Sequence, residues 1–138
     1  MSGLNAANCS DAMMSAVCHG LFTRFPTLRV LPIENGSHWV APLLELLGES
    51  YATHSYLFEE DPVAAFKRNV WAHPFHEEDP RELVKLLGAD HVIFGSDFPH
   101  VEGLADPLSY VDELQGLPED DIRKIMGGNV MNLLGIAA

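Results

Sequence analysis

Apolar residues in the first part of the chain recur at three- and four-residue spacing. In the stretch SDAMMSAVCHGLFTRFP, residues 10–26, they fall on one face of a helix. These apolar positions are Met13, Met14, Val17, Cys18, Leu21, Phe22 and Phe25. Pro26 cannot continue a helix, so we predict that this helix ends there and packs its apolar face into the core.

Later segments carry the signals that mark helix ends. We predict that Ser37 caps a helix in HWVAPLLELLG, that Gly48 ends it, and that residues 49–60 form a loop. An aspartate followed by proline marks further helix starts. These pairs are Asp61–Pro62, Asp79–Pro80 and Asp106–Pro107. A last helix is predicted to start near Pro118 and to break at Gly127–Gly128.

Three apolar runs between these helices suit buried strands, at 28–33, 68–73 and 91–95. Strands that alternate with helices at this spacing are typical of parallel sheets with helical crossovers. We therefore predict an α/β fold in which three parallel strands form one sheet, in sequence order, with helices packed on it. Residues 1–138 are expected to form a single domain.

Composition narrows the classes of partner. The net charge of −12 and the lack of a basic stripe argue against nucleic acid and anionic membranes. No apolar run reaches the roughly 20 residues of a membrane span, and no signal peptide is evident, so a cytoplasmic location is the default expectation. Cys9 and Cys18 lie nine positions apart on one predicted helix, too far to pair, and are expected to be reduced.

The stretch HVIFGSDFPH, residues 91–100, carries the main candidate chemistry. It begins as a buried strand and ends with Asp97 and His100 on a proline-containing loop. Glu34 follows the first predicted strand and His73 ends the second, and the carboxyl ends of parallel strands meet at one sheet edge. We predict that Asp97, Glu34 and His73 cluster there, with His100 at the rim.

Each of these residues also has a plainer interpretation. Asp97 could simply accept backbone N–H groups of its loop, and Glu34 could pair with an arginine or with loop amides. His100 could be a solvated loop histidine. A carboxylate is both a hard metal ligand and a potential general base, so the functional interpretation of Asp97 has a physical reason.

Several separate stretches resemble the amidohydrolase-related metal-dependent hydrolases, in the branch that includes aminocarboxymuconate-semialdehyde decarboxylase. The stretches are RFPTLRVLPIENGSHWVAPLLELL, FKRNVWAHPF, LLGADHVIFGSDFPHVEGLADPL and IRKIMGGNVMNLLG. They follow the family's order and cover nearly the whole chain from about His19 onward. The resemblance implies a distorted (β/α)₈ TIM barrel, a fold of about 250 residues or more. The chain would supply strands six to eight of it.

The resemblance also implies a chemistry. Asp97 matches the family aspartate that binds a divalent metal, typically Zn, or that accepts a proton from metal-bound water. Glu34 and His100 would assist in the hydrolysis or non-oxidative decarboxylation of a small carboxylated or cyclic substrate. The family's HxH pair and its strand-five histidine have no counterpart here. We therefore expect weak or absent metal binding and an inactive isolated chain.

A second hypothesis belongs to another class of function. The chain would be a non-catalytic partner subunit, or a degenerate barrel fragment that persists as an oligomeric module. Under either hypothesis we expect it to form a homo-oligomer or to bind a complementary barrel half, because exposed apolar faces favour association.

Overall fold

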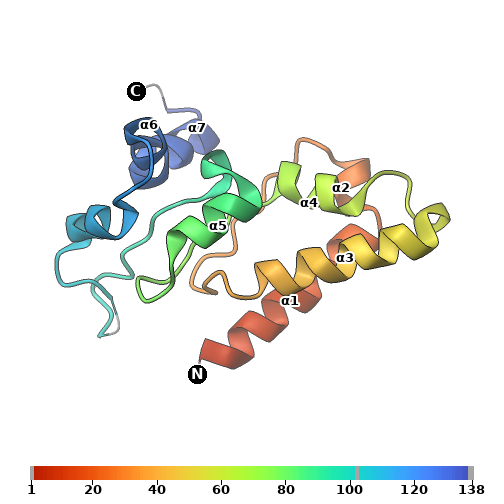
Figure 1. Cartoon of the computed structure of the whole chain (residues 1–138), viewed down its shortest axis with the longest axis horizontal. Coiled ribbons are helices and arrows are strands. Elements are labelled where there is room, and N and C mark those ends of the chain that lie inside the picture. Colours follow the sequence, from red (N-terminus) through yellow and green to blue (C-terminus); the bar gives the residue numbers. More distant parts are fainter. Residues whose placement is uncertain (1, 102, 137–138) are drawn as a thin grey trace.

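The structure is a computed structural model that describes residues 2–101 and 103–136, with the side chains of 2–7 outside the description. Figure 1 shows a chain built from helices. The α-helices are α1 (Ser2–Cys18), α2 (Leu21–Arg24), α3 (Val40–His54), α4 (Pro62–Asn69), α5 (Pro80–Leu87), α6 (Glu119–Arg123) and α7 (Asn129–Leu134). The 3₁₀ helices are η1 (Ser55–Leu57), η2 (Ala89–His91) and η3 (Pro107–Leu114), and η4 (Lys124–Gly128) is a π-helix.

The predicted parallel sheet is wrong. The described residues form no β-strand at 28–33, 68–73 or 91–95, and so contain no part of a barrel wall. What these segments do form are isolated parallel bridges, Val30 with Val70 and Ala72 with Val92. The α/β barrel fragment expected from the sequence is therefore replaced by a helical fold with two point contacts between extended segments.

Prolines explain why the bridges do not grow into strands. Each bridge is held by two backbone hydrogen bonds, and a parallel ladder would be extended by the residue two positions further on. Those positions hold Pro32 and Pro74, which have no N–H to donate. Beyond the second bridge, the Phe94 N–H donates instead to the carbonyl oxygen of Ile125 in η4, at 3.1 Å.

The helices pack in two groups on either side of these bridges (Figure 1). α1, α2, α3 and α4 contact one another, while α5, η2, η3, α6 and η4 form the second group. Fully buried side chains fill both groups and the segment between them, among them Leu43, Phe66, Val70, Val92 and Ile125. Burying a side chain of this size contributes about 1.5–3 kcal/mol, which makes this core the main source of stability.

The aspartate–proline signals predicted helix starts correctly. Asp61, Asp79 and Asp106 each accept a hydrogen bond from a backbone N–H of the helix that follows. Other boundaries differ from the prediction. α3 continues past Gly48 to His54, and the first helix is interrupted at Gly20, whose φ is 67°. None of the described helices combines the length and apolar character needed to cross a membrane.

Buried polar side chains hold the irregular segments in place of a sheet. The side-chain amide of Asn129 donates to the carbonyl oxygens of Ala89 and Val92, at 2.7 and 2.8 Å. The side-chain amide of Asn69 donates in the same way to the carbonyl oxygen of Leu28, at 2.7 Å. Both asparagines are buried, so their hydrogen bonds are shielded from water. They fix the segments that lead to residues 34 and 97.

Candidate metal centre

The structure brings Glu34, Asp97 and His100 together. One ligand atom from each lies within 4.8 Å of the others, and within the described residues this is the group of three side chains that could hold a metal ion. Glu34 follows the first bridged segment, and the other two lie on the loop that follows the second. Their roles in catalysis and metal binding stay predictions, but the cluster shows that this fold presents them on one site.

Hydrogen bonds close the loop that carries Asp97. The N–H of Leu104 donates to the Ser96 carbonyl oxygen at 3.0 Å, and that of His100 donates to the Asp97 carbonyl oxygen at 2.8 Å. Gly103 permits this closure, because a Cβ atom there would lie 2.5 Å from the Asp97 carbonyl oxygen. The loop therefore holds residues 97 and 100 in a fixed relation.

Within the cluster, Nδ1 of His100 lies 3.8 Å from Oδ2 of Asp97. The Asp97 side chain is 19% exposed, whereas that of His100 is 62% exposed and Glu34 is also exposed. The carboxylate at the centre is thus partly shielded from water, and its two partners can be reached from solvent.

The turn before α3 positions Glu34. The Asn35 side-chain amide donates to the Ile33 carbonyl oxygen at 2.7 Å, which tightens the turn. Glu78, which is not part of any motif predicted above, accepts hydrogen bonds from the backbone N–H and the hydroxyl of Ser37. Ser37 therefore does not cap α3 as predicted. No pattern in the sequence links these two residues, which lie 41 positions apart.

His73 was expected beside Asp97 and Glu34, but it is not part of the group that could hold a metal. It is buried, and its Nε2 lies 2.9 Å from the Gly95 carbonyl oxygen. Because a carbonyl only accepts, Nε2 carries the hydrogen, and Nδ1 has no hydrogen-bond partner among the described residues. Its contact with Gly95 supports the segment that leads to Asp97.

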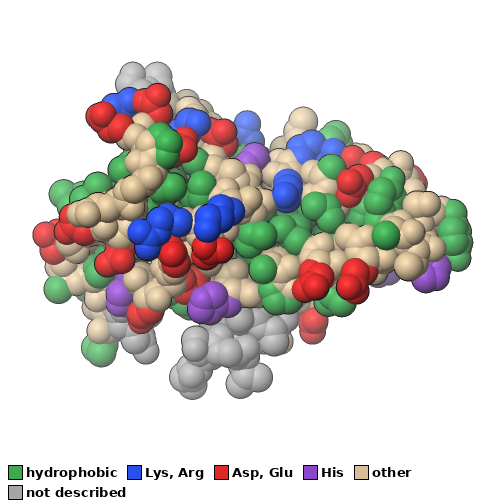
Figure 2. All heavy atoms as spheres, viewed as in Figure 1, with side chains coloured by type: hydrophobic (Ala, Val, Ile, Leu, Met, Phe, Trp, Pro, Cys, Tyr) green, Lys and Arg blue, Asp and Glu red, His purple; other side chains and the backbone are tan. Residues whose placement is uncertain are grey.

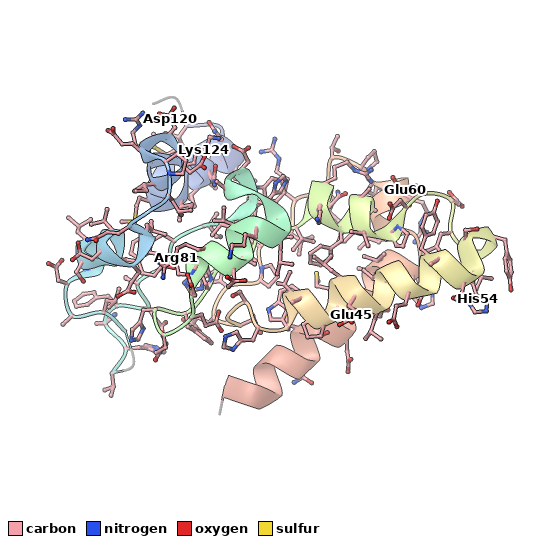
Figure 3. All side chains as sticks on the ribbon, in the orientation of Figure 1. Glu45, His54, Glu60, Arg81, Asp120 and Lys124 are labelled. Carbon is pink, nitrogen blue, oxygen red and sulfur yellow. The ribbon has the colours of Figure 1, made fainter. Side chains whose placement is uncertain are left out.

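The resolved pKa shifts arise away from this cluster. Figure 3 places Glu60 on the α4 side of the molecule, apart from Arg81, Asp120 and Lys124. Hydrogen bonds from Arg68 lower the pKa of Glu60 to about 2. Burial raises the pKa of Tyr110, whose hydroxyl has no hydrogen-bond partner within the described part of the chain. The Glu60 shift reflects an ion pair and the Tyr110 shift reflects burial in the core, so neither marks a second site.

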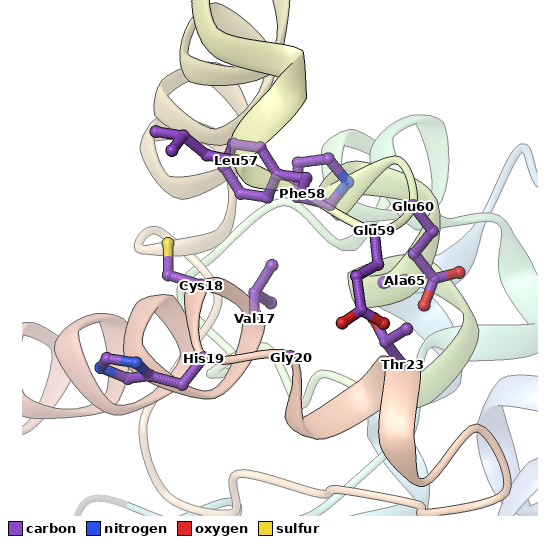
Figure 4. Close-up of a pocket in the computed structure, with 11 residues that line it drawn as sticks. Val17, Cys18, His19, Gly20, Thr23, Leu57, Phe58, Glu59, Glu60 and Ala65 are labelled. Atoms are coloured by element: carbon purple, nitrogen blue, oxygen red, sulfur yellow. The ribbon is translucent and has the colours of Figure 1, made fainter.

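Glu60 also borders a cavity of about 180 Å³ between the end of α1 and the start of α4 (Figure 4). Its wall includes Cys18, Thr23, Leu57 and Glu59. Burial raises the pKa of the Cys18 thiol, which disfavours the thiolate that reacts and binds metals. The cysteines at 9 and 18 are free, as predicted. The Cys18 thiol therefore gives this cavity no activated nucleophile.

The donor set of the cluster suits a divalent cation. Two carboxylates and one imidazole are ligands of zinc and manganese in proteins. Ligands about 2.1 Å from a tetrahedral ion lie about 3.4 Å from one another, so donors spread over as much as 4.8 Å must move inward slightly to share one. The exposed side chains of Glu34 and His100 are free to make that movement.

Sequence and structural comparisons place the chain in a known family. The chain belongs to the amidohydrolase family, whose model, described as Amidohydrolase, matches residues 3–136. The family resemblance drawn from the sequence is therefore confirmed. A solved structure of an amidohydrolase from Mycobacterium avium subsp. paratuberculosis K-10 is 46% identical and superposes on 96% of this chain with a TM-score of 0.91.

Two more solved structures are decarboxylases. A 5-carboxyvanillate decarboxylase from Sphingomonas paucimobilis is 22% identical over 90% of this chain, with a TM-score of 0.68. A dihydroxybenzoic acid decarboxylase from Polaromonas sp. JS666, solved with bound manganese and the inhibitor 2-nitroresorcinol, is 17% identical over 94%, with a TM-score of 0.67. At these identities the likeness concerns the fold.

Curated relatives agree with the family. A 2-amino-3-carboxymuconate-6-semialdehyde decarboxylase from Dictyostelium discoideum is 24% identical over 97% of this chain. The dipeptidase tcpJ of Claviceps purpurea is 33% identical over 57% of it. The chain spans 38% and 19% of the length of these two relatives, and 34–40% of the length of the three solved structures. Decarboxylases and hydrolases both occur among the relatives.

Proposed function

We propose that this chain contributes the Glu34–Asp97–His100 cluster to a metal-dependent hydrolase or decarboxylase of the amidohydrolase family. The observation that supports the proposal is the convergence of these three ligand atoms within 4.8 Å. We take Asp97 as the principal donor because its side chain is less exposed than those of His100 and Glu34. A bound divalent ion would supply Lewis acidity toward a substrate oxygen or water.

The chain's own residues would divide the work around the ion. Asp97 would hold it or accept a proton, since a carboxylate can do either. His100 and Glu34 would complete the donor set or contact the substrate from the solvent side. The substrate class we propose is a small carboxylated or cyclic molecule, in line with the names of the decarboxylase relatives.

We propose weak binding and no turnover by the isolated chain. Within the described residues the cluster has three donor side chains, and two of them are exposed. A complementary segment of the longer family chain would have to add further ligands. The chain spans 34% and 38% of the length of two relatives, which favours a site completed by another segment. We expect a dissociation constant for Mn²⁺ of about 10⁻⁴ M, by analogy with weak Ca²⁺ sites, in which low ligand charge and low rigidity reduce the affinity.

Isothermal titration with MnCl₂ tests the proposal. The wild-type chain should bind one ion, which dialysis against EDTA should remove, and Asp97→Asn should weaken binding at least about tenfold, since it loses a charged ligand. Asp112→Asn removes the same charge from an exposed site on η3 and should leave binding unchanged. Absence of saturable binding, or an equal loss in both variants, would contradict the proposed site.

A further inference from the structure

A buried carboxylate lies behind the turn that carries Glu34. Glu78 is 9% exposed, and its Oε2 accepts hydrogen bonds from the Ser37 N–H at 2.7 Å and the Ser37 hydroxyl at 2.6 Å. Its other oxygen lies 3.6 Å from Nδ1 of His38, whose side chain is 84% exposed. A buried carboxylate is tolerated only when it is well hydrogen-bonded, so this side chain and the turn stabilise each other.

The turn is shaped to fit against this carboxylate. Gly36 has a φ of 62°, and a Cβ atom there would lie 2.5 Å from Oε1 of Glu78 and 2.7 Å from Cδ2 of Phe75. On its other side, Nε1–H of Trp39 donates to the Gly36 carbonyl oxygen at 2.8 Å. The backbone two residues after Glu34 thus accepts a hydrogen bond from Trp39 and lies so close to Glu78 and Phe75 that it has no room for a side chain.

We propose that Glu78 is a positioning residue, which fastens the turn of residues 33–39 and thereby holds Glu34 beside Asp97 and His100. The inference rests on the proposed cation site, because positioning matters only if Glu34 is a ligand. Glu34 has a φ of 58°, a conformation that a non-glycine residue keeps only when its surroundings enforce it. Without Glu78, the Ser37 donors lose their acceptor and the turn is free to relax.

The test separates positioning from general stability. Glu78→Ala should weaken Mn²⁺ binding about tenfold, the usual effect of losing a residue that orients a ligand. Glu78→Gln keeps an oxygen that can accept both Ser37 bonds and should stay within about twofold of wild type. Glu77→Gln changes the exposed neighbour and should have no effect. Leu47→Ala, which leaves a cavity in the core under α3, should lower stability but not Mn²⁺ affinity.

Hydrogen exchange measured without metal gives a second readout. Amides of residues 33–39 should exchange faster in Glu78→Ala, and those of α3 and α4 should not. Ser37→Ala, which loses one of the two bonds, gives a milder variant should Glu78→Ala fail to fold, and should show an intermediate effect. Unchanged exchange in 33–39, or equal Mn²⁺ affinity in Glu78→Ala and wild type, would overturn the proposal. If wild type binds no Mn²⁺, the proposed cation site fails, while the exchange data alone decide whether Glu78 fastens the turn.

Discussion

Glu34 and Asp97 have backbone conformations that few side chains adopt. Their φ angles are 58° and 56°, and within residues 2–101 and 103–136 they are the non-glycine residues with positive φ. Aspartate tolerates this region because its short side chain can bond locally, but glutamate has no such advantage. The strain costs roughly 1–2 kcal/mol per residue. Its occurrence at two members of one cluster supports the hypothesis of a functional site.

Replacing the strained glutamate should therefore separate stability from binding. Glu34→Gly is expected to raise the free energy of unfolding by up to about 1 kcal/mol, because glycine adopts positive φ without strain, and to weaken Mn²⁺ binding. Urea denaturation and titration measure the two effects. Glu45→Gly, an exposed position within α3, should instead lower stability by about 1 kcal/mol. If Glu34→Gly is less stable than wild type, backbone strain at Glu34 does not lower the stability of the chain.

Gly36 should be far less tolerant of a side chain than Gly20. Both have similar φ angles, 62° and 67°, but only at Gly36 would a Cβ atom meet neighbouring atoms. Gly20→Ala is expected to lose about 1 kcal/mol through strain alone, and Gly36→Ala at least about 1 kcal/mol more through overpacking. Thermal unfolding of the two variants gives the comparison. Equal losses would show that the contact with Glu78 and Phe75 is not tight.

At the scale of elements, Arg68 links α2 to α4. Its guanidinium donates to both carboxylate oxygens of Glu60, at 2.7 and 2.9 Å, and to the carbonyl oxygen of Phe22 at 3.1 Å. Paired donors of this kind match a carboxylate well. The pair is partly exposed, with 39% and 29% of the two side chains accessible, so water screens much of its attraction.

This ion pair predicts a pH-dependent contribution to stability. The pKa of Glu60 is lowered from 4.5 to about 2, chiefly by the hydrogen bonds from Arg68. Its contribution is therefore present above pH 4.5 and is lost as the pH falls toward 2. Glu60→Gln should cost about 1 kcal/mol at pH 7, and the difference from wild type should shrink between pH 4.5 and 2. Urea titrations across this range measure it, and a difference independent of pH would contradict the assignment.

The helices could be predicted from local signals, and the sheet could not. Asp61, Asp79 and Asp106 start helices as predicted, because capping depends on neighbouring residues. The apolar runs of the predicted strands are buried in part, at Val70 and Val92, yet they pair at single points. Strand pairing needs donors in register on both partners, and the prolines two residues past each bridge remove them. Both prolines are visible in the sequence, Pro32 inside 28–33 and Pro74 directly after 68–73, but the apolar pattern alone does not show where pairing would need a donor.

At the scale of the whole molecule, acidic and apolar side chains share the surface (Figure 2). Twenty acids against eight bases give the chain a net charge of −12. Large apolar side chains are nevertheless exposed near the candidate site and on η3. They include Phe98 at 63%, Val101 at 101% and Leu108 at 72% exposed. Apolar groups gathered on a surface favour association, and charge opposes only nonspecific contacts.

We accordingly predict that the chain associates, with itself or with a complementary segment of the longer family chain. Sedimentation equilibrium at micromolar concentration should give a mass above 15.2 kDa for the chain alone, and Phe98→Asp should shift it toward the monomer. Leu46→Asp, at an exposed position on α3, is the matched control. A monomer whose unfolding does not depend on concentration would contradict self-association.

More of the candidate site than of the surrounding fold could be predicted from the sequence. Asp97, Glu34 and His100 were identified because each follows an apolar segment in the order of the family's motifs, and the structure brings them together. Glu78 and Ser37 could not be found, since their contact joins residues 41 positions apart. His73 was expected in the same cluster but is not part of it, because its ring is buried and bonded to the Gly95 carbonyl oxygen.

The central claim is that Glu34, Asp97 and His100 hold one divalent cation. Crystals of the chain soaked in MnCl₂ and measured near the manganese absorption edge test it most directly. The account predicts one anomalous peak within about 2.0–2.4 Å of donor atoms from all three residues, with the turn of residues 33–39 held against Glu78. A peak bound elsewhere, or no peak at millimolar MnCl₂ with the three side chains ordered, would contradict it.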